Sequence, residues 1–191
     1  MDQIYGFSKE KKFLINNYHK NSLANSIIFS GQKGIGKSTF VFNLLKEIFK
    51  LSVSENQIKH HLNLIDNNSH TNIKYLTKDY DDKLKKEKTI ITVGQIRKLN
   101  NFFYETTFDD LPKFIIIDSA DDLNINASNS LLKILEEPKN KTYIFLVSHQ
   151  LSSLLPTIRS RCLKFVFKNH KFETFKMILK NKIGIENEES L

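Results

Sequence analysis

The residues best suited to chemistry lie in a glycine-rich stretch near the amino terminus. Residues 31–38 read Gly-Gln-Lys-Gly-Ile-Gly-Lys-Ser, which fits the pattern G-x-x-x-x-G-K-[ST] in full. Glycine permits tight turns and close backbone approach, so this spacing lets a loop wrap its N–H groups around a phosphate. Lys37 would reach the terminal phosphates, and the Ser38 hydroxyl would coordinate Mg²⁺. The predicted nucleotide-binding residues of this stretch are Gly31, Gly34, Gly36, Lys37, Ser38 and Thr39.

A carboxylate that could complete this site follows the apolar run at residues 114–117. Asp118 directly ends the run, and in that position it would hold Mg²⁺ through water beside the phosphate loop. Asp121 and Asp122 come shortly after. We interpret these two as solvated loop acids, with a catalytic role as the alternative. A loop that keeps the motif without binding a ligand is the competing interpretation of the whole site.

The segments around these residues alternate between short apolar runs and helical patterns. Nearly continuous apolar runs are typical of strands that are buried on both faces of a parallel sheet. The predicted strands are 26–30, 73–77, 114–117, 143–147 and 163–167, and the predicted helices begin at 38 and span 94–104, 127–137 and 151–158. The polar segments 51–72 and 78–88 are predicted to be surface connections of low order. The pattern therefore indicates an α/β fold.

Composition restricts the class of protein. The 191 residues suffice for one substantial domain and the start of a second. Cys162 is the single cysteine, so an internal disulfide and a thiolate zinc site are both excluded. The formal charge of +8 suggests an acidic partner such as nucleic acid, although genomic base composition would also produce it. No signal-peptide pattern or apolar stretch of ~20 residues is present, so we expect a cytoplasmic protein without a membrane partner.

Three further stretches resemble the clamp-loader subunits of the AAA+ family. Residues 126–138 read Asn-Ala-Ser-Asn-Ser-Leu-Leu-Lys-Ile-Leu-Glu-Glu-Pro and resemble the "NALLKxLEEP" helix of that family. Residues 148–150, Ser-His-Gln, resemble the end of its sensor strand. Residues 154–162, Leu-Leu-Pro-Thr-Ile-Arg-Ser-Arg-Cys, resemble its "SRC" motif in the form familiar from the delta prime branch. With the loop and Asp118, these stretches cover most of residues 1–167 in the expected order.

The resemblance implies a five-stranded parallel AAA+ sheet that works in a ring-like assembly of bacterial DNA polymerase III. Such rings open the sliding clamp and load it onto primed DNA. The implied cofactors are ATP and Mg²⁺. The implied partners are gamma/tau and delta subunits and the DNA backbone, with the sliding clamp contacted indirectly.

The residue after Asp118 bears on whether the site hydrolyses ATP. Ser119 stands where hydrolysing members usually carry a glutamate, so the resemblance implies MgATP binding with poor hydrolysis and favours the delta prime branch over gamma and tau. Two alternatives stay open. One is an active gamma-like ATPase in which Asp121 replaces the glutamate, and the other is an unrelated P-loop ATPase that binds nucleic acid.

The resemblance also assigns roles to residues outside the loop. Arg161 of the SRC motif would reach into a neighbouring subunit's ATP site as an arginine finger, and a plain surface arginine is the alternative. Ser148 would be the polar sensor near the γ-phosphate, with an ordinary strand-end serine as the alternative. Gln95, Arg97 and Lys98 lie on a helix that would face DNA and could contact its phosphates without reading sequence. The charged face of an ordinary amphipathic helix would look the same.

The resemblance finally divides the chain into an AAA+ domain at 1–167 and the first helix of a truncated lid at 168–191. The lid and collar domains of the family would extend further, so we expect either a fragment or a short version. Many members carry a four-cysteine zinc module after the phosphate loop. His60, His61 and His70 fall in that interval without thiolate or carboxylate partners at ligand spacing, so we expect no zinc.

Overall fold

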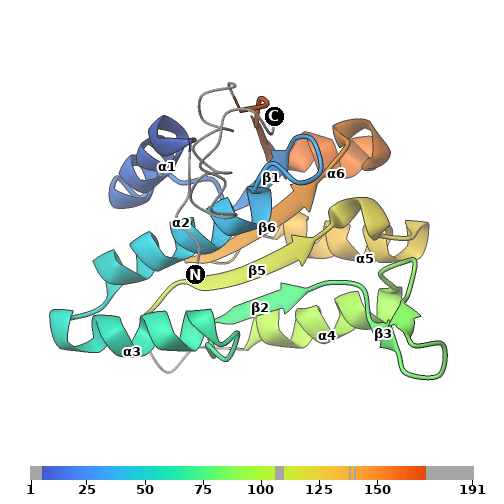
Figure 1. Cartoon of the computed structure of the whole chain (residues 1–191), viewed down its shortest axis with the longest axis horizontal. Coiled ribbons are helices and arrows are strands. Elements are labelled where there is room, and N and C mark those ends of the chain that lie inside the picture. Colours follow the sequence, from blue (N-terminus) through green and yellow to red (C-terminus); the bar gives the residue numbers. More distant parts are fainter. Residues whose placement is uncertain (1–5, 106–109, 138, 140, 171–191) are drawn as a thin grey trace, which may run out of the picture.

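A parallel sheet forms the centre of the molecule (Figure 1). The computed structural model describes residues 6–105, 110–137, 139 and 141–170. Its main sheet has five strands in the order β2-β5-β6-β1-β7, and every pair is parallel. These strands are β1 (Ser26–Ser30), β2 (Ile73–Leu76), β5 (Lys113–Asp118), β6 (Thr142–Ser148) and β7 (Leu163–Val166). The predicted five-stranded parallel sheet is confirmed.

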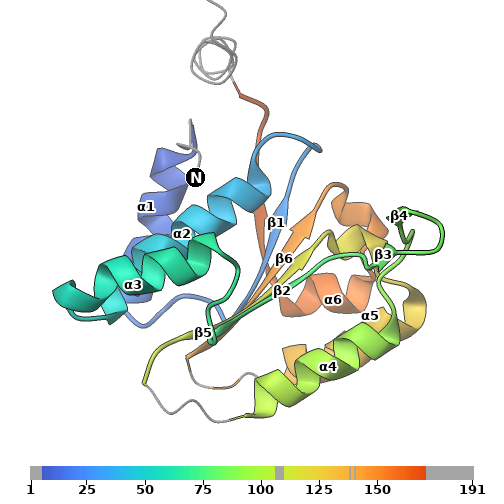
Figure 2. The same cartoon turned by 60° about the horizontal axis from the view of Figure 1, so that its bottom comes forward.

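Helices cover both faces of this sheet (Figure 2). One face carries α1 (Ser8–His19), α2 (Lys37–Ser52) and α3 (Glu55–Asp66), and the other carries α4 (Val93–Tyr104), α5 (Ile125–Glu136) and α6 (Pro156–Arg161). Successive strand residues point to opposite faces. On β1, Ile27 and Phe29 pack toward the first group of helices, while Ile28 packs toward the second. Both faces of each central strand are therefore apolar, which explains the unbroken apolar runs.

Aromatic packing holds β1 against α2, and so fixes both ends of the glycine-rich loop. The Phe29 ring is fully buried, with its centroid 5.8 Å from that of Phe40 on α2 and 5.2 Å from that of Phe145 on β6. Burying one such side chain contributes about 1.5–3 kcal/mol. Both ends of the loop between β1 and α2 are therefore held by well-packed elements.

The composition of residues 51–72 predicts a surface connection of low order, but the structure shows a helix in this segment. Residues 55–66 form α3, with Ser54 as N-cap and Glu55 in its first turn. Ile65 is buried, and Leu62 packs against the core cluster beside α2. The prediction is wrong because a single narrow apolar stripe suffices to dock a helix that is otherwise polar.

The helix expected at 151–158 begins later than its pattern predicts. Residues 151–153 form a short 3₁₀ turn, η2 (Leu151–Ser153), and α6 begins only at Pro156. The residue before a proline avoids helical geometry, and proline itself suits the first helical position. Leu155 accordingly has ψ 138° and serves as the N-cap.

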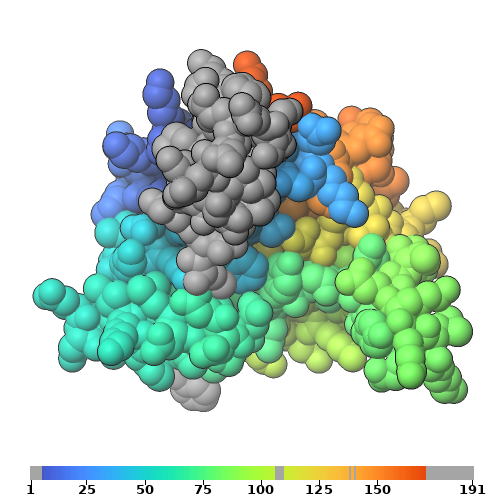
Figure 3. Space-filling view, viewed as in Figure 1, coloured from blue at the N-terminus to red at the C-terminus, as the bar shows by residue number. Residues whose placement is uncertain are grey.

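Two further segments complete the described fold. Residues 78–88, expected to be an unordered connection, contain a small antiparallel hairpin of β3 (Tyr80–Asp81) and β4 (Lys86–Glu87). Figure 3 shows α3 and this hairpin at opposite ends of one face. The lid helix expected from 168 onward lies outside the described residues beyond His170. No helix in the described part of the chain is long and apolar enough to cross a bilayer.

Candidate nucleotide-binding site

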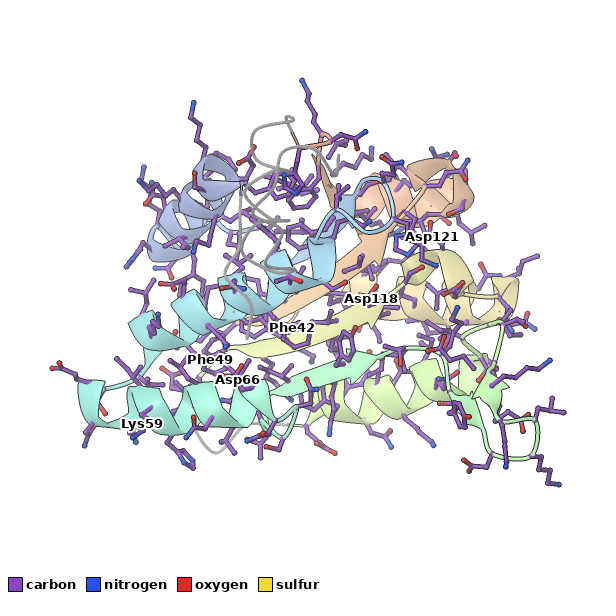
Figure 4. The ribbon with its side chains drawn as sticks, in the orientation of Figure 1. Phe42, Phe49, Lys59, Asp66, Asp118 and Asp121 are labelled. Carbon is purple, nitrogen blue, oxygen red and sulfur yellow. The ribbon has the colours of Figure 1, made fainter. Side chains whose placement is uncertain are left out.

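The predicted site residues meet at one edge of the sheet because its strands are parallel. Gly31 follows β1, Asp118 ends β5 and Ser148 ends β6. The registers align Ser30 with Ser148 and Asp118 with Val147. Ligands of open α/β sheets bind outside these carboxyl ends. Figure 4 shows Asp118 and Asp121 together at this edge.

The loop has the backbone geometry that its glycines predict. Gly34 and Gly36 have φ angles of 87° and 90°, which other residues rarely adopt. A Cβ at either position would meet nothing within 4 Å, so open space lies over the loop, whereas a Cβ at Gly31 would lie 2.8 Å from Ile35 Cδ1. Gly36 is also the N-cap of α2 and offers no side-chain cap to its first N–H groups. An open loop at an uncapped helix N-terminus fits a phosphate group.

Lys37 lies across this loop with its side chain folded back onto it. The residue is 3% exposed, and its Nζ donates to the carbonyl oxygens of Gly31 (2.7 Å) and Gln32 (2.8 Å). Burial lowers the pKa of Lys37, while the nearby charges of Asp118 and Asp121 oppose that shift. The ammonium group is therefore held over the loop by weak carbonyl acceptors, which a phosphate oxygen could replace.

Asp118 collects two hydroxyl donors on one oxygen. Its Oδ2 accepts hydrogen bonds from Ser38 Oγ at 2.5 Å and from the Tyr75 hydroxyl at 2.9 Å. Hydroxyl and carboxylate oxygens are the hard ligands that Mg²⁺ prefers, so the predicted pair Ser38 and Asp118 fits this ion. Burial, followed by the charge of Asp118, raises the pKa of Tyr75, so the phenol stays a donor at neutral pH.

Asp121 forms the densest hydrogen-bond network of the site. Its carboxylate accepts five hydrogen bonds at 2.5–3.2 Å. The donors are the hydroxyl groups of Ser119, Ser148 and Ser153 and the backbone N–H groups of His149 and Gln150. Burial alone would raise the pKa of Asp121, but these donors together lower it below the ordinary carboxyl value. Asp121 therefore joins the turn after β5 to the segment after β6.

The interpretation of Asp121 and Asp122 as solvated loop acids is wrong. Asp121 holds the network above, and Asp122 lies 3.2 Å from Lys78 Nζ in an ion pair. The network also bears on the catalytic alternative for Asp121. An ionised carboxylate offers about four lone-pair sites, and five donors already converge on it. With a lowered pKa as well, Asp121 is poorly suited to activate water.

The lowered pKa of Asp121 makes part of the stability dependent on pH. A depressed carboxyl pKa adds stability above the unfolded pKa of about 3.9, and that contribution is lost as the pH falls through the folded value. Asp121→Asn should therefore lower the free energy of unfolding by about 1–3 kcal/mol at pH 7, because charged hydrogen bonds are lost. The deficit should shrink from about pH 4 downward.

Urea unfolding of both proteins at pH 7, 5, 4 and 3 measures this difference. Asp122→Asn is the matched control, because Asp122 lies in the same turn but its carboxylate pairs with the partly exposed Lys78 instead of joining the Asp121 network. A deficit for Asp121→Asn that stays constant from pH 7 to pH 3 would contradict this account.

The other residues near the loop and the strand ends make contacts within the protein. Ser148 is fully buried, and its hydroxyl donates to Asp121 Oδ1 at 3.0 Å, so it is more than an ordinary strand-end serine. Thr39 lies in the first turn of α2 and is half-buried. Ser119, which stands in place of a glutamate, is 6% exposed and donates to Asp121 at 2.9 Å.

Arg161 lies at the carboxyl end of α6 and has polar partners within the chain. Its Nη2 lies 2.7 Å from Glu136 Oε1 at the end of α5, and its Nη1 donates to the Thr157 carbonyl at 3.0 Å. The side chain is 35% exposed. The guanidinium is thus oriented by the fold and still accessible from outside.

The predicted DNA-contacting residues separate into two groups. Arg97 and Lys98 are exposed on α4, as a phosphate contact requires. Gln95 is 7% exposed, and its Nε2 donates to the Thr77 carbonyl (3.0 Å) and to Asp79 (2.9 Å), while its carbonyl completes the capping box of α4. The prediction that Gln95 touches DNA is wrong, because the residue at the third helical position is used to cap the helix.

The histidines between the loop and β5 take part in packing. His61 Nδ1 and His70 Nε2 lie within 2.9 Å of each other, and both rings contact Phe49 of α2. Among the residues that the structure describes, no group of three or more His, Cys, Asp or Glu is arranged to hold a metal ion.

Tyr75 is the site residue that the sequence does not predict. It stands in the strand Ile-Lys-Tyr-Leu, where a tyrosine reads as ordinary strand packing. Its role depends on the pairing of β2 with β5, which aligns Tyr75 with Ile116. Asp118 is two residues beyond Ile116 and so projects from the same face. Only knowledge of the strand order could have revealed this contact.

Comparison with known proteins agrees with this geometry. A family model described as DNA polymerase III, delta subunit, matches residues 7–171. The chain is 33% identical over 159 residues to the delta prime subunit of DNA polymerase III from Bacillus subtilis, covering 82% of this chain and 46% of that protein. It is 46% identical over 74 residues to the delta prime subunit of Pseudomonas aeruginosa, covering 39% of this chain and 23% of that protein. The chain thus spans less than half the length of these relatives.

A solved structure shows the same fold. The crystal structure of a DNA polymerase III gamma subunit-related protein from Thermotoga maritima superposes with a TM-score of 0.57 at 23% identity, covering 96% of this chain and 52% of that one. The fold is that of the AAA+ P-loop proteins. The chain belongs to the DNA polymerase III delta-subunit family, and the two relatives compared above are bacterial delta prime subunits.

Proposed function

We propose that this chain is the AAA+ part of a clamp-loader subunit that binds MgATP, hydrolyses it slowly and supplies Arg161 to a neighbouring subunit. The observation that carries this proposal is that one site has groups suited to binding a magnesium nucleotide but lacks a carboxylate suited to hydrolysing it. The loop, Lys37, Ser38 and Asp118 offer groups suited to the phosphates and the Mg²⁺ of a nucleotide. Ser119, the residue that follows, has no carboxylate to orient water.

The binding residues would divide the ligand between them. The N–H groups of the loop and of the first turn of α2 face the open space over Gly34 and Gly36, where phosphates would lie. Lys37 would exchange its carbonyl acceptors for terminal phosphate oxygens. Ser38 and Asp118 would hold Mg²⁺, which when bound neutralises phosphate charge. Thr39 and Ser148 complete the predicted contacts, with Ser148 anchored by Asp121.

Ser119 and Asp121 would make hydrolysis slow. A catalytic base or a residue that positions the attacking water is a recurrent part of sites that transfer the γ-phosphate. Ser119 is buried and its hydroxyl is engaged by Asp121, and Asp121 itself is occupied by five donors. The site is therefore arranged to bind a nucleotide and to leave it intact.

Arg161 would act on a different nucleotide, in the site of the adjoining subunit. Arginine always carries its charge and forms bidentate contacts with phosphate, so it can offset the charge that develops during phosphoryl transfer. Its position at the exposed end of α6 supports such a role. Gamma/tau and delta subunits are the proposed partners, and the sliding clamp would be reached indirectly through the assembled ring. The proposed AAA+ domain covers 1–167, and 168–191 would begin a lid.

Primed DNA is a further proposed partner, contacted through its backbone by Arg97 and Lys98 on α4. Neutralised phosphates release counterions, so each contact contributes about 0.9 to the slope of log affinity against log salt. The double variant Arg97→Ala/Lys98→Ala should lower that slope by about 2 in a fluorescence-anisotropy titration of the assembled complex. The control is Lys83→Ala/Lys85→Ala in the β3–β4 hairpin. Equal slopes for the two double variants would contradict the DNA contact.

Co-assembly tests the proposed function as a whole. The full chain, mixed with gamma and delta subunits from the same source, should elute with them as one complex in size-exclusion chromatography with MgATP present. Failure to co-elute under conditions where gamma and delta associate would contradict the proposed assembly with these subunits.

A further inference from the structure

The Asp121 carboxylate connects the nucleotide site to the segment that leads into α6. Its Oδ2 accepts from His149 N at 2.6 Å, and its Oδ1 accepts from Gln150 N at 3.2 Å and from Ser153 Oγ at 2.5 Å. These donors span the whole turn after β6, from its first residue to the last residue of η2. Hydrogen bonds to a charged group are about twice as strong as neutral ones. The turn after β6 is thus tied to the turn after β5 rather than left as a free surface loop.

The tied turn directly precedes α6. Ser153 is separated from Pro156, the first residue of α6, by Leu154 and Leu155 only. Leu154 is 4% exposed and packs in the core, so little slack exists between the turn and the helix. The helix itself has six residues, which is under two turns. Ile158 is the one buried residue of α6, so the segment that leads into the helix also helps to set its position.

The other end of α6 carries Arg161. The guanidinium is oriented by Glu136 at 2.7 Å and by the Thr157 carbonyl at 3.0 Å, and Ile158 anchors the middle of the helix with 0% exposure. Thr157 belongs to α6, so any shift of the helix carries this contact with it. The hydrogen bonds of Asp121 therefore fix the turn before α6, and Arg161 lies at the other end of that helix.

We propose that Asp121 is a positioning residue for Arg161, acting through η2 and α6, an inference that rests on the proposed function. A displacement of about 1 Å in a group that stabilises a transition state costs about 100-fold in rate. Partial release of the turn should therefore weaken the action of Arg161 on the neighbouring site without removing the arginine. Asp121 would itself touch neither nucleotide.

The test uses the full chain with the gamma subunit and follows gamma's ATP turnover as the chain is titrated. Asp121→Asn and Ser153→Ala should lower the maximal stimulation by about tenfold, because Arg161 is misplaced. The half-saturating concentration should stay the same. The double variant Asp121→Asn/Arg161→Ala should stimulate no less than Arg161→Ala alone, because both changes remove the same contribution. Asp122→Asn and Ser152→Ala, from the same two turns, should match the wild-type chain.

The outcomes separate the two proposals. If Arg161→Ala stimulates as well as the wild-type chain, the proposed function fails. If Arg161→Ala loses the stimulation but Asp121→Asn and Ser153→Ala behave like their controls, the inference about Asp121 is wrong. If melting curves show that Asp121→Asn does not fold, the result for Ser153→Ala alone tests the inference about Asp121. Ser153 is exposed, and its removal leaves the other donors to Asp121 in place.

Discussion

Lys37→Ala should weaken MgATP binding by about 100-fold. The Lys37 ammonium lies over the loop, where the hydrogen-bond acceptors that the described residues give it are the carbonyls of Gly31 and Gln32, so it can turn to a phosphate without breaking an ion pair within that part of the chain. Hydrogen bonds to charged groups contribute about 1.5–3 kcal/mol, and each 1.4 kcal/mol is a factor of about ten in affinity. Isothermal titration calorimetry with MgATP measures the change directly.

The control for Lys37 lies on the same helix. Lys50 is exposed near the carboxyl end of α2, so Lys50→Ala removes the same charge from the same element far from the loop. Its affinity for MgATP should equal that of the wild-type chain. If Lys37→Ala and Lys50→Ala bind equally well, the loop keeps its motif without using it, and the nucleotide site is not where we place it.

Arg161→Ala should reduce the ATP turnover that the chain stimulates in a neighbouring subunit by about 1,000-fold. An arginine finger contributes at least that much to phosphoryl transfer when it is well placed. The chain's own affinity for MgATP should not change, because the polar partners that the described structure gives Arg161 are Glu136 and Thr157. The two readouts together distinguish an action in trans from damage to the fold.

Lys164→Ala is the matched change for this experiment. Lys164 is exposed on β7, three residues beyond Arg161, and carries the same charge. Stimulation by Lys164→Ala should equal that of the wild-type chain. A loss of stimulation shared by both variants would indicate a general charge effect at this edge of the sheet and would remove the specific role of Arg161.

Local patterns were sufficient to predict the sheet and the phosphate loop. The apolar runs at 26–30 and 143–147 are unbroken because helices cover both faces of their strands, and a pattern of that kind is visible in the sequence alone. The positive φ angles at Gly34 and Gly36 were predictable because glycine is the residue that adopts such angles readily. Asp118 was predictable because its strand ends with it.

Contacts that depend on tertiary structure could not be predicted. Tyr75 reaches Asp118 only because β2 lies beside β5, and no local pattern contains that strand order. Asp121 reads as a loop acid until the turn after β6 folds over it. For Gln95 the sequence predicted a DNA contact on a basic helix face, but the side chain is buried and caps the helix.

The most direct test of the account is MgATP binding and turnover by the isolated chain. We predict saturable binding that Lys37→Ala weakens, with turnover much slower than that of the gamma subunit assayed in parallel. Turnover by the chain alone that is as fast as that of gamma and that Lys37→Ala abolishes would contradict the account and make this protein an ATPase in its own right.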